Sequence, residues 1–82
     1  MKREYKPDYD KAFRDEHIKW FEERMDRLPK SLQINDAMYS SNLELTVKGL
    51  IRTLRSNVPN VTFSGYMNTL LQIREKLEEQ GL

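Results

Sequence analysis

Residues 41–56, with the sequence SNLELTVKGLIRTLRS, carry the most regular pattern in the chain and decide its fold class. Apolar side chains recur there with the spacing of one α-helical face. They are Leu43, Val47, Leu50, Ile51 and Leu54. The start has the form of a capping box. In such a box the Ser41 hydroxyl accepts from a backbone amide of the first turn, and the Glu44 side chain reaches back to the backbone amide of Ser41. The pattern predicts a helix over residues 42–56.

One residue of this helix is not explained by the apolar pattern. Gly49 lies off the apolar face, and glycine costs a helix roughly 1 kcal/mol relative to alanine. We therefore expect a partner element to approach closely at Gly49. Beyond it, Asn57, Val58 and Pro59 end the helix.

A second helical pattern precedes this one, over residues 10–27. Its apolar and aromatic residues, with two basic ones, fall in one arc of a helical wheel. The arc contains Phe13, His17, Ile18, Trp20, Phe21, Arg24, Met25 and Leu28. Pro29 ends the pattern, because the residue before a proline is pushed out of the α region.

A third pattern predicts a helix over residues 62–79, and Gly81 suits the turn after its last residue. Its apolar stripe contains Phe63, Tyr66, Met67, Leu70, Ile73 and Leu77. Between the first two helices, residues 29–41 form a connector in which Leu32 and Ile34 alternate with a polar residue. No strand partner is evident for so short a run, so we expect an extended connector whose apolar residues dock on the helices.

The three patterns together predict an all-α fold, a small three-helix bundle with an extended connector after the first helix. A chain of 82 residues makes one domain, so we expect residues 1–82 to form a single helical domain. Each apolar stripe is too wide to remain in water, and the three helices must share one core.

Composition excludes several classes of function. The chain has 14 basic and 13 acidic residues and a net charge of +1, which argues against a strongly basic nucleic-acid coat. It has no cysteine, which excludes a disulfide framework, a zinc ribbon and a thiol nucleophile. No phosphate-binding glycine loop, histidine pair or nucleophile elbow occurs. We therefore expect no enzyme, with no catalytic residue, no cofactor and no metal site.

Two basic residues lie in the apolar arc of the first helix, and each has two interpretations. His17 is either a general base or, as we favour, a histidine that packs its ring and bonds a neighbour. Arg24 either lays its aliphatic stem over the core with its head in water, or anchors an anionic partner.

A basic stripe lies on the second helix, where Lys48, Arg52 and Arg55 are spaced four and three residues apart. Such a stripe is either a solvated face or a set of phosphate contacts. A helix-turn-helix is disfavoured because the outward face of the third helix lacks arginine and ends in acids. The alternative function is therefore a nucleic-acid-binding accessory or regulatory protein that uses this stripe.

Aromatic residues outside the three stripes are the best candidates for a contact surface, since tyrosine is favoured at interfaces. They are Tyr5, Tyr9 and Tyr39. The contact surface that we predict consists of Trp20, Arg24, Tyr39, Lys48, Arg52 and Arg55. The function that we favour is a non-enzymatic protein–protein interaction module, with another protein or a second copy as partner and a homodimer as one version.

The start of the chain is basic but is followed by charged residues, which does not match a secretory signal. No run of about 18 apolar residues occurs, so no membrane span is expected. The expected location is the cytoplasm.

Residues 20–77 resemble a group of small uncharacterised bacterial helical proteins. The resemblance rests on Trp20-Phe21, on the step from Leu28-Pro29 to Asn35-Asp36, on residues 62–66 and on the closing helix. It implies an all-helical fold and a bacterial cytosolic origin, and it implies no activity.

Overall fold

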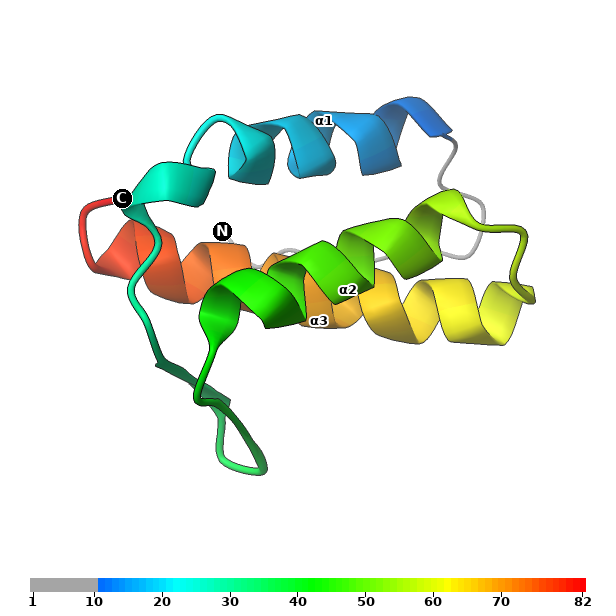
Figure 1. The fold of residues 1–82 in the computed structure, drawn as a ribbon. Helices are drawn as coiled ribbons and strands as arrows, with labels where there is room; N and C mark the ends of the chain where they lie inside the picture. Colours follow the sequence, from blue (N-terminus) through cyan, green and yellow to red (C-terminus); the bar gives the residue numbers. More distant parts are fainter. Residues whose placement is uncertain (1–10) are drawn as a thin grey trace.

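The computed structural model describes residues 11–82 and contains three α-helices, a short 3-10 helix and two strands (Figure 1). In chain order they are α1 (Lys11–Glu22), η1 (Met25–Arg27), β1 (Leu32–Asn35), β2 (Met38–Ser40), α2 (Leu43–Arg55) and α3 (Asn60–Glu79). Each helix contacts the other two, and β1 contacts α3. In Figure 1, α1 lies above the α2–α3 pair, and the two strands extend from the lower left of the helices.

The expected all-α fold is wrong, because the connector folds as an antiparallel β-hairpin and the chain is mixed α/β. Leu32 pairs with Ser40, and the register shifts by a bulge before Asn35 pairs with Met38. The Gln33 side chain donates to both main-chain carbonyls at the bulge, those of Asn35 (2.6 Å) and Met38 (3.1 Å). The strand that the sequence did not reveal is the three-residue segment directly after the turn.

The Asn35 side chain helps to fix the turn of the hairpin. The side-chain carbonyl oxygen of Asn35 accepts from the backbone amide of Ala37 at 2.9 Å, which is the geometry of an Asx turn. The side-chain amide nitrogen of Asn35 donates to the side-chain oxygen of Gln72 on α3 at 2.7 Å. Asn35 therefore both closes the hairpin and ties it to the helices.

The helices differ from the expected ranges mainly at their ends. The first expected helix is divided, since α1 ends at Glu22 and a 3-10 turn follows at Met25–Arg27, and the expected start at Asp10 lies outside the described residues. The second helix begins one residue late because its N-cap is Asn42, whose side chain accepts from the Leu45 amide at 3.3 Å. The capping role expected for Ser41 is therefore wrong.

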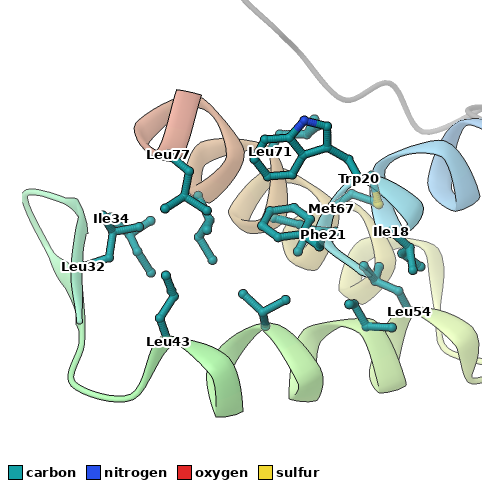
Figure 2. Packing of buried hydrophobic residues seen from close by; sticks show 14 residues of the cluster. Ile18, Trp20, Phe21, Leu32, Ile34, Leu43, Leu54, Met67, Leu71 and Leu77 are labelled. Atoms are coloured by element: carbon teal, nitrogen blue, oxygen red, sulfur yellow. The ribbon is translucent and has the colours of Figure 1, made fainter. Parts of the chain in front are cut away.

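The core lies between the three helices and the inner face of the hairpin (Figure 2). Its buried apolar residues are Ile18, Trp20, Phe21, Leu32, Ile34, Leu43, Val47, Ile51, Leu54, Met67, Leu70, Leu71, Ile73 and Leu77. Figure 2 shows Leu32 and Ile34 on the same side as Leu43 and Leu77, so the hairpin closes one end of the core. The alternation of buried and exposed residues along β1 follows from the two-residue period of a strand.

Candidate functional site

A groove lies between the end of α1 and the outer side of α2. It has a volume of about 670 Å³. Its lining residues are Glu22, Met25, Lys48, Ile51, Arg52, Arg55 and Ser56. We call it the α1–α2 groove. It exists because α1 stops at Glu22 and the chain turns before the 3-10 helix, which brings Met25 over α2.

Charge in the α1–α2 groove is unevenly distributed. The Lys48 ammonium lies 2.8 Å from a Glu44 oxygen, and the Arg55 guanidinium lies 3.1 Å from a Glu22 oxygen. Among residues 11–82, no carboxylate pairs with Arg52, whose side chain is exposed. The lining thus contains three cations and one carboxylate, with the apolar side chains of Met25 and Ile51 between them.

The opposite edge of α1, which faces α3, is closed by Trp20. This side chain is only 9% exposed, and guanidinium groups lie over its ring at 4.4 Å (Arg24) and 4.8 Å (Arg74). Arg24 also donates to the main-chain oxygens of Trp20 (3.0 Å) and Leu82 (3.4 Å). Trp20 therefore belongs to the core, and Arg24 covers it from outside.

His17 is 5% exposed and lies in the same region. A guanidinium nitrogen of Arg74 donates to its Nδ1 at 2.9 Å. Because arginine cannot accept, Nδ1 is the acceptor and the neutral ring carries its proton on Nε2. The ring of Phe13 packs against the imidazole at 4.5 Å. These contacts match the interpretation of His17 as a packed histidine bonded to a neighbour.

The six residues of the predicted contact surface do not form one surface. Lys48, Arg52 and Arg55 come together in the α1–α2 groove. Trp20 and Arg24 lie on the α3 side of α1. Tyr39 is 60% exposed on the hairpin, whereas Tyr5 and Tyr9 lie outside the described residues.

Four contributors to the groove were not predicted as site residues, namely Glu22, Met25, Ile51 and Ser56. Met25 and Ile51 were recognised only as members of apolar faces. Their shared position depends on where α1 ends relative to α2, for which the local sequence gives no signal.

Within residues 11–82, no group of three or more histidine, aspartate or glutamate side chains is placed to hold a metal ion. In the same part of the chain, no helix combines the length and the apolar character needed to cross a membrane.

The comparisons with known proteins identify a family and no activity. The family described as "Domain of unknown function (DUF6965)" matches residues 15–79, which is most of the chain. No curated protein and no solved structure matches. The match confirms the expectation of a family of uncharacterised small proteins. The chain belongs to the DUF6965 family.

Proposed function

We propose that this chain is a non-enzymatic protein-interaction module whose α1–α2 groove holds a segment of another protein, and that the segment carries apolar and acidic side chains. One observation carries the proposal. The apolar side chains of Met25 and Ile51 and the cations of α2 line the same groove. Apolar anchors inside a charged rim are the usual arrangement of a protein contact site.

The charges of the groove favour a protein segment over a nucleic-acid backbone. Phosphate binding needs several cations free to release counterions, and two of the three here already have carboxylate partners. Half-buried Met25 adds apolar area that a phosphate backbone would not use, and the nearly buried Ile51 lies at the floor of the groove. An acidic segment with a few apolar side chains satisfies both features of the groove.

The test is a comparison of two charge reversals that change the net charge equally. Arg52→Glu alters the groove, whereas Lys19→Glu alters an exposed residue of α1 on the α3 side. The wild type and each variant are immobilised on a support and incubated with an extract of the source organism. Bound proteins are then cross-linked and identified by mass spectrometry. We expect one partner to be retained by the wild type and by Lys19→Glu, and lost with Arg52→Glu.

Equal retention of that partner by the two variants would contradict the proposal. Binding that disappears after nuclease treatment and falls steeply with salt would replace it with the nucleic-acid alternative. Light scattering of the purified chain covers a third outcome. A dimer that Arg52→Glu dissociates would make a second copy of the chain the partner.

A further inference from the structure

The hairpin has an open edge along β2, away from the α1–α2 groove. Within residues 11–82 the sheet consists of β1 and β2 alone, so β2 is paired along one edge only. Because successive residues of a strand direct their N–H and C=O groups to opposite edges, part of the main chain of β2 is directed away from β1. The hairpin extends from the helices (Figure 1), and residues 36–39 are all exposed. Such an edge is a template for pairing with another strand.

The side chains of β2 do not protect this edge. Proteins commonly block an exposed edge strand with lysine, proline or other charged residues. No charged residue and no proline lies between Asp36 and Glu44. Met38 is 40% exposed and Tyr39 is 60% exposed, so two large side chains with apolar area remain in water beside the open edge.

Contacts with the helices hold the hairpin in place. The side-chain amide of Asn35 donates to Gln72 on α3 at 2.7 Å, and the hydroxyls of Ser40 and Thr46 lie 2.6 Å apart, which joins the end of β2 to α2. A two-stranded hairpin alone is only marginally stable in water, and these contacts supply what it lacks. A strand that is already ordered loses little entropy when a partner pairs with it.

We propose that β2 pairs antiparallel with β2 of a second copy of this chain, with Tyr39 on the two-fold axis, so that two hairpins form one four-stranded sheet. The chemistry of the edge sets the kind of occupant, since its main-chain donors and acceptors are satisfied by another strand. The charge of the edge favours a second copy. Residues 37–43 are neutral, so an identical strand meets no like charge there, and a strongly charged strand would gain no ion pair.

The proposed register is consistent with these side chains. In a symmetric antiparallel pair, residues equally far from the axis along the two chains lie opposite each other. Asp36 then lies opposite Asn42 of the second copy, so the two Asp36 carboxylates do not face each other. The two Tyr39 side chains are directly opposite, at a distance where cross-strand aromatic pairs interact.

This surface is separate from the α1–α2 groove, because none of the residues that line the groove belongs to the hairpin. The inference therefore goes beyond the proposed function, and the two can fail independently. A dimer formed through β2 leaves the groove of each copy available to a different partner.

Engineered cysteines test the register directly, since the chain has no cysteine of its own. Tyr39→Cys places two thiols opposite each other at the axis, whereas Val61→Cys places a thiol on α3 at a residue that is 81% exposed. Each full-length variant is incubated in a glutathione redox buffer, and the covalent dimer is measured on non-reducing gels. We expect Tyr39→Cys to form the dimer at least about tenfold faster, because pairing raises the effective concentration of its thiols. Exposure alone would favour Val61→Cys.

Lysine substitutions test the association without a covalent bond. Tyr39→Lys and Val61→Lys each replace an exposed side chain and add one positive charge. Sedimentation equilibrium should give a dimer for the wild type and for Val61→Lys, and a monomer for Tyr39→Lys, because two lysines would face each other at the axis. Tyr39→Phe should retain the dimer, and circular dichroism checks that every variant is folded.

A monomeric wild type at millimolar concentration would overturn the inference, as would equal rates of disulfide formation in the two cysteine variants. A dimer that survives Tyr39→Lys would also overturn it. Arg52→Glu should leave the β2 dimer intact, so a dimer that only Arg52→Glu dissociates would contradict this inference and place the second copy at the groove.

Discussion

The two edges of α1 differ in how the structure uses its cations. Toward α3, Arg24 and Arg74 cover Trp20, donate to main-chain oxygens or to His17, and leave only a hollow of about 270 Å³. Toward α2, the groove is more than twice as large, and Arg52 stands at its rim without a carboxylate partner in the described residues.

The difference shows that arginine content alone does not mark a binding surface. The side chain of Arg74 is 14% exposed and holds parts of the chain together, so its removal should affect folding. The Arg52 side chain is exposed and contacts no carboxylate in the described residues, so its removal should affect the proposed partner binding and not the folding. The environment of each guanidinium, which depends on tertiary packing, separates a structural role from the recognition role that we propose.

The largest expected effect comes from truncating one apolar side chain on each edge. Trp20→Ala should lower the free energy of unfolding by about 3–5 kcal/mol, because it leaves a large cavity under two guanidinium groups. Met25→Ala should cost only about 1 kcal/mol, since Met25 is half-buried at the groove. Urea denaturation followed by circular dichroism measures both. Equal losses would mean that the groove edge is as important for folding as the α3 edge.

The next comparison applies one substitution to the two arginines. Arg74→Met should cost about 1.5–3 kcal/mol, because it removes a charged donor to His17 and a partner of Glu78. Arg52→Met should change stability by less than about 0.5 kcal/mol, as exposed substitutions do. Arg52→Met should nevertheless weaken the binding of acidic peptides, which are short synthetic segments of glutamate and leucine that represent the proposed partner. The Arg74→Met variant should bind these peptides normally at temperatures where it is folded. The same denaturation measures the stability of both variants, and calorimetry measures peptide binding. A stability loss in Arg52→Met would contradict the distinction.

The sequence was most informative where a pattern is local. The periodicity from Leu43 to Leu54 placed α2 within one residue at each end, because amphipathic spacing needs no knowledge of other elements. The hairpin was missed for the opposite reason. Met38 and Tyr39 are both exposed, so β2 lacks the alternation that identifies a strand, and its pairing depends on Asn35 and Gln33 side chains at the turn.

The candidate site was predictable only in part. The spacing of Lys48, Arg52 and Arg55 placed them on one helical face, and the structure brings all three to the groove. The other wall comes from a different helix, and its place depends on where α1 ends. Trp20 was expected at a surface because it lies near the edge of its apolar arc. Nothing local could show that Arg74, from the distant α3, would cover the ring.

The smallest effect concerns the acid that the groove already contains. A carboxylate oxygen of Glu22 lies 3.1 Å from the Arg55 guanidinium, in the place that a partner carboxylate would take. Glu22→Gln should therefore tighten binding of the acidic peptides by a few fold, while stability changes by less than about 1 kcal/mol, as for exposed ion pairs.

Glu16→Gln is the matched control, because it removes the same charge from an exposed residue of the same helix, on the α3 side. Both variants raise the net charge equally and attract an acidic peptide equally over long distances, an effect that salt screens. Only Glu22→Gln frees Arg55, so its advantage over Glu16→Gln should persist in calorimetry at higher salt. Equal affinities of the two variants would show that the groove attracts acids by its overall field, and that Arg55 makes no direct contact with the partner.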